Sequence, residues 1–355
     1  MRFIGCKNNI LSNIYDFIKK KNIAGKTFCD IFSGTTCVAT FFKDKDYKVI
    51  SNDALYFSYV LQKAYIENNK YPSFAKLSNN LNIEDRENNK IAPLKTIINY
   101  LNNLEGRKGF IYKNYSHEGT AKKKARRMYF SGENASKIDA IRQKIEEWDK
   151  KKLLAKNEYF ILLASLIEAV PFVSNISGTY GAFLKHWDPR ARKKLTLSVP
   201  KIYSNKSNNK AYNVDGVKLA KNTKCDILYL DPPYNNRQYV PNYHVLETIA
   251  LYDNPLVKGV TGMRDYQKQK SQFCRRETAK NALRDIAQNG KYKHLILSYN
   301  NEGIMQDSDI KEALSTVGNV EKEFIEYRRF KSHNRGNNNH KKFVNELLYY
   351  VTKKT

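Results

Sequence analysis

A short stretch, ILYLDPPYNNRQY (residues 227–239), places a carboxylate and an aromatic ring directly after an apolar run. Prolines cannot donate to a sheet ladder, so they predict that a strand ends there, at the carboxyl edge where open α/β sheets bind ligands. Asp231 and the carbonyl of Pro232 can each accept a hydrogen bond, and Tyr234 can stack on a ring. With Pro233, they predict a rigid site for a flat group that carries an exocyclic amine. The alternative is a purely structural Asp-Pro-Pro turn.

A second candidate site lies nearer the N-terminus. Gly34 stands among small residues just after the apolar stretch FCDIF, so a tight turn there can present backbone N–H groups and a helix N-terminus to a ligand. Asp53 ends the next apolar run, VISND, where a carboxylate can accept hydrogen bonds from both hydroxyls of a ribose. The spacing alone equally allows Asp53 to be a helix N-cap.

The elements that must position these residues alternate between strand and helix. This alternation predicts a parallel, doubly wound sheet that an antiparallel hairpin closes. Predicted strands cover residues 26–32, 47–53, 225–231 and 293–300, with the hairpin at 323–330 and 345–351. Helices are predicted at residues 8–21, 33–44 and 54–69, and two more, outside this rhythm, at 134–150 and 157–170.

The charge balance points to a polyanionic partner. Lys and Arg outnumber Asp and Glu by 62 to 35, which favours nucleic acid. Biased codon usage could raise the Lys content, but it does not explain clustered arginines such as those of AKKKARRMYF (residues 121–130). No run suits a membrane span or a signal peptide, and the five cysteines form neither a CxxC pair nor a zinc pattern. We therefore expect a reduced, cytoplasmic protein without a structural metal.

Taken in order, these segments resemble the motifs of the DNA adenine-N6 methyltransferases, in particular the Dam-like (alpha) group. RFIGCKNNIL resembles that family's N-terminal cofactor segment, DIFSGT its S-adenosylmethionine loop, SND its ribose acid and LYLDPPYNNRQY its catalytic motif. SNISGTYGAFLK (residues 174–185) is similar to the segment that carries a DNA-contacting hairpin, and LILSYNNEG resembles a later core strand. The loop departs from the commoner FxGxG form, because Thr36 replaces the second glycine.

The resemblance implies a Rossmann-like S-adenosylmethionine-dependent methyltransferase fold with an inserted, mainly helical, basic target-recognition domain. It implies a cofactor-binding half over residues 1–84, the DNA-binding insert over 85–210 and a catalytic half over 211–355. The implied reaction moves a methyl group to N6 of an adenine that has been flipped out of duplex DNA. The implied catalytic residues are Asp231, Pro232, Pro233 and Tyr234.

The resemblance also implies the cofactor contacts. Lys7 is expected near the carboxylate of S-adenosylmethionine and Asp53 at its ribose. Asp215 is expected near its adenine, although a plain turn aspartate is an equal alternative. The full implied set is Phe3, Lys7, Asp30, Phe32, Gly34, Thr35, Asp53, Asp215 and Asp231.

The basic insert supplies candidates for DNA contacts, with a merely solvated charged face as the alternative. They are Lys122, Lys123, Lys124, Arg126, Arg127, Ser177, Tyr180, Arg190, Arg192 and, outside the insert, Arg237. We expect a monomer or weak dimer that acts on double-stranded DNA, with a possible cognate restriction endonuclease. An RNA adenine or N4-cytosine methyltransferase is one alternative function, and a catalytically silent specificity protein is another.

Overall fold

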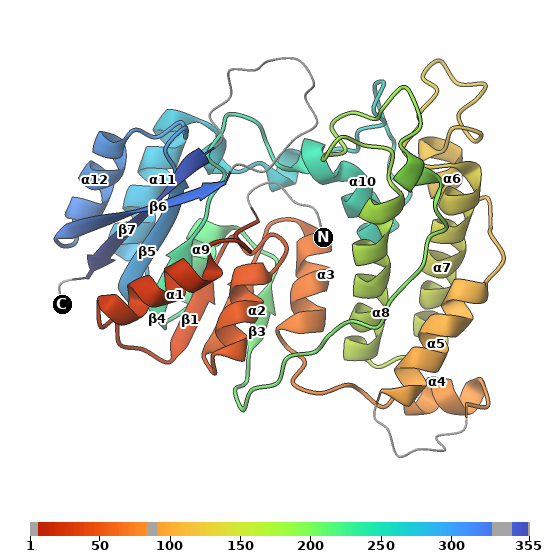
Figure 1. Ribbon diagram of the computed structural model, residues 1–355, viewed down its shortest axis with the longest axis horizontal. Helices are drawn as coiled ribbons and strands as arrows, with labels where there is room; N and C mark the ends of the chain where they lie inside the picture. The colour runs from red at the N-terminus through yellow and green to blue at the C-terminus, as the bar shows by residue number, and fades with distance from the viewer. Residues whose placement is uncertain (1–5, 84–90, 329–342, 354–355) are drawn as a thin grey trace. The chain divides into compact units, whose positions relative to one another are not determined.

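The chain folds into two compact units, seen in a computed structural model that describes residues 6–83, 91–328 and 343–353 (Figure 1). One unit, here called the sheet unit, comprises Gly5–Gln62, Ser204–Tyr239 and Lys268–Thr355. The other, here called the helical unit, comprises Lys63–Tyr203 and Val240–Gln267. The chain therefore crosses between the units several times, as expected for a sheet fold that carries an insert.

The sheet unit is built on seven strands in the order β3-β2-β1-β4-β5-β7-β6. Strands β1 to β5 run parallel to one another, and β7 runs antiparallel to both β5 and β6. The predicted parallel sheet and its closing hairpin are thereby confirmed. The strands are β1 (Thr27–Asp30), β2 (Lys48–Asn52), β3 (Lys210–Tyr212), β4 (Cys225–Leu230), β5 (Tyr292–Asn300), β6 (Val320–Arg328) and β7 (Phe343–Thr352).

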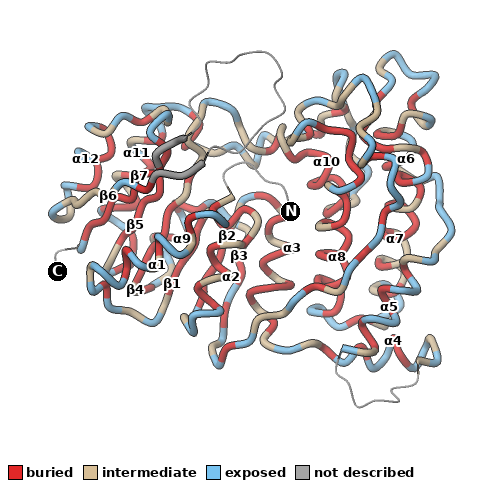
Figure 2. Tube along the Cα trace, in the orientation of Figure 1, coloured by how far each residue is buried: buried red, intermediate tan, exposed pale blue. Residues whose placement is uncertain are grey.

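Helices cover both faces of this sheet, so its central strands are apolar on both sides (Figure 2). Leu228 of β4 belongs to the core formed with α9, α11 and α12. On the other face, the ring of Phe28 stacks on Phe42 of α2 at 3.8 Å, and Phe17 of α1 meets Tyr350 edge-on. The helices are α1 (Leu11–Lys20), α2 (Cys37–Asp44), α9 (Gly216–Asn222), α11 (Arg276–Asn289) and α12 (Asp307–Ser315), while α3 (Tyr56–Tyr65) runs across the boundary between the units.

The helical unit packs around α8 (Lys156–Ala169), which is buried through nearly all of its turns. Its sequence is apolar on all sides, which is typical of a central helix. Helices α7 and α8 confirm the two predicted at 134–150 and 157–170. The other helices are α4 (Ala75–Asn80), α5 (Ala92–Asn103), α6 (Phe110–Tyr115), α7 (Gly132–Lys150) and α10 (Val240–Leu251).

The unit boundaries differ from the limits predicted for the insert. The helical unit begins at Lys63 rather than near residue 85, and it also takes in Val240–Gln267. That later segment contains α10, whose turns are almost entirely buried and which contacts α8. An apolar helix must be buried, but its sequence does not tell which core will bury it. The functional labels given to residues 1–84, 85–210 and 211–355 stay predictions.

Candidate active site

The site is assembled at the carboxyl edge of the sheet. Strands β1 and β4 are parallel neighbours, with Asp30 in register with Tyr229, and β2 lies on the other side of β1. Parallel strands end at a common edge, so the segments that follow β1, β2 and β4 come together there. Asp30 ends β1, and the other two segments carry Asp53 and Asp231. All three aspartates belong to the set of cofactor contacts that the family resemblance implies.

The loop after β1 is held by carboxylates. Phe32 N–H donates to Asp30 Oδ1 at 3.3 Å, and Gly34 N–H donates to Asp53 Oδ2 at 2.8 Å. Asp53 Oδ1 also accepts from Leu55 N–H at 2.9 Å, one residue before α3 begins. Asp53 therefore joins the glycine loop to the start of a helix, and a local turn role exists beside its predicted ribose contact.

Thr36 explains why a glycine is common at its position. Its backbone is left-handed, with φ 64° and ψ 11°, and Gly34 is left-handed as well at φ 50°. A β-branched residue in this conformation costs about 1–2 kcal/mol, whereas glycine adopts it freely. The loop therefore keeps the glycine-type path although this chain has threonine there.

A buried group of three charges lies beside the DPPY motif (residues 231–234), which is the predicted catalytic motif. Lys7 is 4% exposed, and its Nζ lies 3.1 Å from Asp231 Oδ1 and 2.6 Å from Glu346 Oε1. Glu346 belongs to β7, is fully buried and also accepts from Ser298 Oγ. Among the described residues, its other oxygen, Oε2, has no hydrogen-bond partner. Two carboxylates thus share one ammonium group, so the group is net negative when all three are ionised.

This arrangement shifts the pKa values of Asp231 and Lys7, and that of Asp30 nearby is shifted as well. Burial raises the pKa of Asp231 to about 7, Lys7 opposes that rise, and Glu346 adds to it. Burial also raises the pKa of Asp30 to about 8, with the nearby charge of Asp231 as the second cause. For Lys7, burial lowers the pKa, but Asp231 and Glu346 more than offset this, so its pKa is raised. Such a site favours a bound cation, because a cation stabilises every one of these carboxylates.

The catalytic motif is tethered at several points. Pro232 is buried and Tyr234 is half-buried, packed against the main core of the sheet unit. The carbonyl of Tyr234 accepts from Ile304 N–H at 2.9 Å. Gln238 exchanges two hydrogen bonds with the backbone of Ser271, at 3.0 and 2.7 Å. The segment is therefore fixed by side-chain and backbone contacts as well as by its prolines.

The remaining predicted cofactor residues lie in varied surroundings. Phe3 lies outside the described residues. The ring of Phe32 meets Phe273 edge-on at 5.2 Å. Thr35 Oγ1 donates to the sulfur of Cys6. Asp215 caps α9 by accepting from Lys218 N–H at 2.9 Å, so the plain turn role exists there, and its contact with the cofactor stays a prediction.

The sequence analysis missed Glu346 and Ser298. The one available signal was a glutamate within the apolar run FVNELLYYV, since a charge inside a central strand needs a partner. The partner itself depends on the pairing of β5 with β7, which sets Ser298 opposite Leu348 and brings Glu346 beside Asn300.

The predicted DNA-contacting residues divide by exposure. Arg127 is 6% exposed and Tyr180 is 1% exposed, and both bond to groups inside the helical unit, so we leave them out of the interface. Arg190 is half-buried and makes a two-point ion pair with Asp188. The exposed members are Lys122, Lys123, Lys124, Arg126, Ser177 and Arg192 in the helical unit and Arg237 in the sheet unit.

A comparison with known protein families identifies the family of this chain. The model of the D12 class N6 adenine-specific DNA methyltransferases matches residues 3–313. The chain belongs to this family. The resemblance inferred from the ordered motifs is thereby confirmed, and so is the methyltransferase fold class.

Individual relatives match over nearly the whole chain. The chain is 44% identical to the Type II methyltransferase M.FokI of Planomicrobium okeanokoites over 99% of its length, and 43% identical to the modification methylase StsI of Streptococcus sanguinis over 100%. It covers only 52% of each of these two proteins, so it spans about half their length. It is 36% identical to the Type II methyltransferase M.NlaIII of Neisseria lactamica and covers 98% of that protein.

A methyltransferase needs a methyl donor, and the residues of this D12 site fit a cationic one. Asp231 and Glu346 share a single buried ammonium group, that of Lys7. Asp30 lies close enough to Asp231 for their charges to interact, and Asp53 adds a carboxylate at the neighbouring strand end. The sulfonium and amino groups of S-adenosylmethionine carry the complementary charge. Over residues 6–83, 91–328 and 343–353, no group of His, Cys, Asp and Glu is arranged to hold a metal ion. Within the same residues, every helix is too short or too polar to cross a membrane.

Proposed function

We propose that this chain transfers a methyl group from S-adenosylmethionine to N6 of adenine in double-stranded DNA, as the modification enzyme of a restriction–modification pair. Family membership supports the reaction class and the target base. The relative M.NlaIII, a Type II methyltransferase that the chain covers almost fully, supports the biological setting. The observation that carries the proposal is the Asp231 carboxylate, held by Lys7 beside Tyr234 at the edge of the sheet.

Asp231 and Pro232 have defined tasks in this mechanism. The adenine amino group is a weak nucleophile, because its lone pair is delocalised into the ring. The adenine amino group donates one hydrogen bond to Oδ2 of Asp231 and one to the carbonyl of Pro232. These two acceptors favour a pyramidal nitrogen as charge develops on it. Lys7 holds Oδ1 and orients the carboxylate. Tyr234 stacks on the flipped base, which must leave the duplex to reach such a pocket.

The proton balance also assigns a task to Asp231. N6 gains a carbon and must lose one proton, and Asp231 Oδ2 is the atom that we assign to receive it. A carboxylate with a pKa of about 7 is better matched to this step near neutral pH than an ordinary aspartate. The raised pKa of Asp231 arises mainly from burial. The location of the motif at the end of a buried strand therefore helps Asp231 to accept the proton.

The cofactor contacts follow from the same edge of the sheet. When bound, S-adenosylmethionine supplies an electrophilic methyl group. Asp53 is assigned to its ribose hydroxyls, and the Asp30–Thr35 loop to its methionine part. Asp215 is assigned to the surroundings of its adenine. The exposed cations of the helical unit are assigned to DNA phosphates, which position the protein without reading sequence.

The test is transfer of labelled methyl from S-adenosylmethionine to unmethylated duplex DNA, with nucleoside analysis of the product. N6-methyladenine confined to one short sequence supports the proposal. N4-methylcytosine would overturn the target base, and transfer to RNA alone would overturn the substrate.

Asp231→Asn is the matched variant for this experiment. It keeps the shape of the side chain but removes the charge and the proton acceptor, so we expect transfer to fall by about 10²–10⁴-fold with DNA binding retained. Undiminished transfer would remove Asp231 from the mechanism. DNA binding without any transfer by the wild type would favour a silent specificity protein.

A further inference from the structure

A tightly held loop follows α10 in the helical unit, over residues 252–263. The backbones of Lys258 and Met263 pair in both directions, at 2.8 Å each, and close a small hairpin. At the base of the loop, the guanidinium of Arg264 makes two hydrogen bonds to the carboxylate of Asp253, at 3.0 and 2.7 Å. Two-point pairs of this kind fix direction as well as distance. The two ends of the loop are therefore held together by this ion pair.

Buried side chains of the same unit also hold the tip of the hairpin. Arg127 donates to Val260 O at 3.0 Å through Nε and to Gly259 O at 2.9 Å through Nη2. The hydroxyl of Tyr115, a fully buried residue, donates to Gly262 O at 2.8 Å. Burial lowers the pKa of Arg127, which shows that placing this cation inside the unit is unfavourable in itself. The fold nevertheless uses it to fix the backbone of the hairpin.

This well-held loop presents apolar side chains to solvent. Leu256 is 77% exposed and Val260 is 66% exposed. Single exposed apolar residues are ordinary on protein surfaces. Here two exposed apolar residues lie on one short loop, and buried polar groups fix its backbone. This combination indicates a rigid binding surface.

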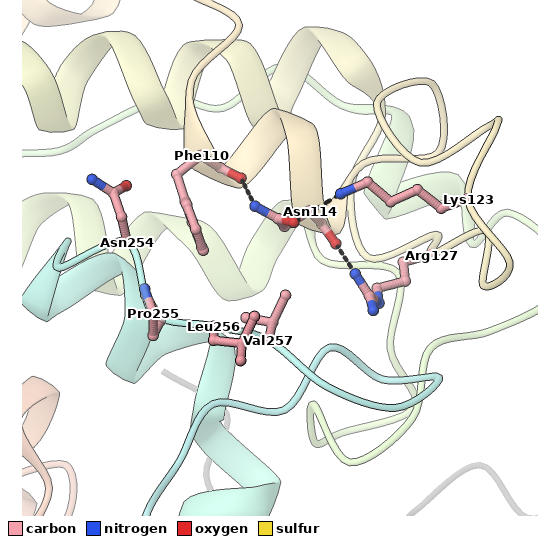
Figure 3. A pocket seen from close by; sticks show the side chains of 8 residues that line it. All are labelled: Phe110, Asn114, Lys123, Arg127, Asn254, Pro255, Leu256 and Val257. Carbon is pink, nitrogen blue, oxygen red and sulfur yellow. Dashed lines mark hydrogen bonds between the residues drawn. The ribbon is translucent and has the colours of Figure 1, made fainter.

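The surroundings of the loop are positively charged. Leu256 lines a groove of about 520 Å³ together with Phe110, Lys123 and Arg127 (Figure 3). None of the described residues that line this groove is acidic. The exposed residues Lys122, Lys124, Arg126 and Lys258 lie on the two segments that bound it, and Asp253 is already paired with Arg264. Exposed apolar side chains beside a cationic rim suit nucleic acid, in which apolar base faces lie between rows of phosphates.

We infer that Leu256 and Val260 form a wedge that contacts the bases of duplex DNA while Lys123 and its neighbours contact phosphates. This inference rests on the proposed function. Apolar side chains inserted at a base step replace part of the stacking lost when the step opens. The loop would thereby favour the opened duplex that a base-flipping enzyme requires. Its rigidity matters, because a mobile loop would lose conformational entropy on insertion.

The test uses two duplexes that differ only opposite the target adenine, in the sequence identified by nucleoside and site analysis. One is fully paired, and the other carries a mismatch that already weakens the pair. For the double variant Leu256→Ser, Val260→Ser, we expect kcat/KM to fall about 10- to 100-fold on the paired duplex. On the mismatched duplex we expect a fall of no more than about threefold, since opening is already favoured there.

The matched control is Phe324→Ser on β6 of the sheet unit, which is 61% exposed and belongs to no assigned site. It should leave kcat/KM unchanged on both duplexes. Equal losses on both duplexes for the double variant would overturn the wedge, because they would indicate weaker binding or a damaged fold. A second variant, Val260→Ala, guards against misfolding: with an unchanged melting temperature it should still lose several-fold on the paired duplex alone, and no loss would overturn the inference.

A failure of the proposed function would look different. The wild type would then transfer no methyl group to either duplex, and the wedge would be judged on DNA binding. The double variant should weaken binding to the paired duplex more than to the mismatched one, and equal binding to both would overturn the wedge as well.

Discussion

The two units bury charge for different purposes. In the sheet unit, the buried cation Lys7 meets two carboxylates and forms a net negative group next to the catalytic motif. In the helical unit, the buried cation Arg127 meets neutral backbone carbonyls and holds a hairpin in shape. The first arrangement tunes pKa values and the second fixes geometry. A buried charge therefore reveals its role through the charge of its partners, not through its burial alone.

The exposed charges complete this comparison. Lys122, Lys123, Lys124 and Arg126 lie on the surface of the helical unit, immediately before buried Arg127. Solvent screens exposed cations, so they contribute little to folding but can release counterions when they meet phosphates. The same short segment thus holds binding residues and a scaffold residue side by side.

The largest effect on stability is expected for Lys7→Met. This change leaves Asp231 and Glu346 buried without their shared cation, so the free energy of unfolding should fall by about 3–5 kcal/mol at pH 8. The loss should shrink as the pH falls. Without Lys7, the buried Asp231 has a folded-state pKa well above its unfolded value, so the folded state binds a proton more tightly than the unfolded state does. Urea unfolding at several pH values measures this.

The control for that change is Lys123→Met, an exposed lysine of the helical unit. Its unfolding free energy should stay within about 0.5 kcal/mol of the wild type at every pH. Similar losses for the two variants would show that the buried group of the sheet unit has no special role in stability.

The neighbours Arg126 and Arg127 provide the next test. Arg127→Met removes three hydrogen bonds from a buried guanidinium to backbone carbonyls, so we expect a loss of about 2–4 kcal/mol in unfolding free energy. Arg126→Met should leave stability unchanged but reduce the slope of log affinity for DNA against log salt by about one. The two measurements are urea unfolding and a salt titration of DNA binding. If Arg126→Met lowered stability and Arg127→Met reduced the salt slope instead, the assignment of Arg127 as scaffold residue and Arg126 as binding residue would be reversed.

This pair also shows where sequence reasoning succeeds and where it ends. Strands β1, β2, β4 and β5 were predictable because each is an apolar run bounded by turn residues. Strand β3, Lys210–Tyr212, was missed because three residues carry no pattern. Arg126 and Arg127 have the same local sequence, and only the tertiary fold decides which of them faces solvent.

The candidate site shows the same division. Asp231 and Tyr234 were predictable because the rigid DPPY motif is rare and follows a strand. Glu346 was not, since its role depends on a partner 339 positions away in the chain. Helix α10 was not predicted, and its sequence does not show that it would be buried in the helical unit.

A smaller effect is expected for Glu346→Gln, which tests whether the buried group tunes the chemistry. Glu346 raises the pKa of Asp231, so its neutralisation should lower that pKa. Transfer requires ionised Asp231 and is lost as the pH falls through its folded-state pKa. The acidic limb of the pH profile of kcat should therefore move to lower pH by about one unit.

The measurement is kcat at saturating DNA and cofactor between pH 5.5 and 8.5. Glu323→Gln on the neighbouring strand β6 is the control, because Glu323 pairs only with Lys20 among the ion pairs of the described residues. It should leave the profile in place. A shift of the Glu346→Gln profile to higher pH would contradict the electrostatic account.

The smallest effect concerns the backbone, where the units again differ. The loop after β1 in the sheet unit places β-branched Thr36 in the left-handed region, whereas the hairpin of the helical unit uses Gly259 there, at φ 70°. Thr36→Gly should raise the free energy of unfolding by about 0.5 kcal/mol, since relief of strain slightly exceeds the added freedom of the unfolded chain. Gly259→Thr should lower it by about 1–2 kcal/mol, because a Cβ there meets nothing within 4 Å and backbone strain alone would act. Thermal unfolding of the two variants measures both. A loss of stability in Thr36→Gly would mean that its side chain, whose hydroxyl donates to Thr35 O, stabilises the loop by more than its backbone strains it.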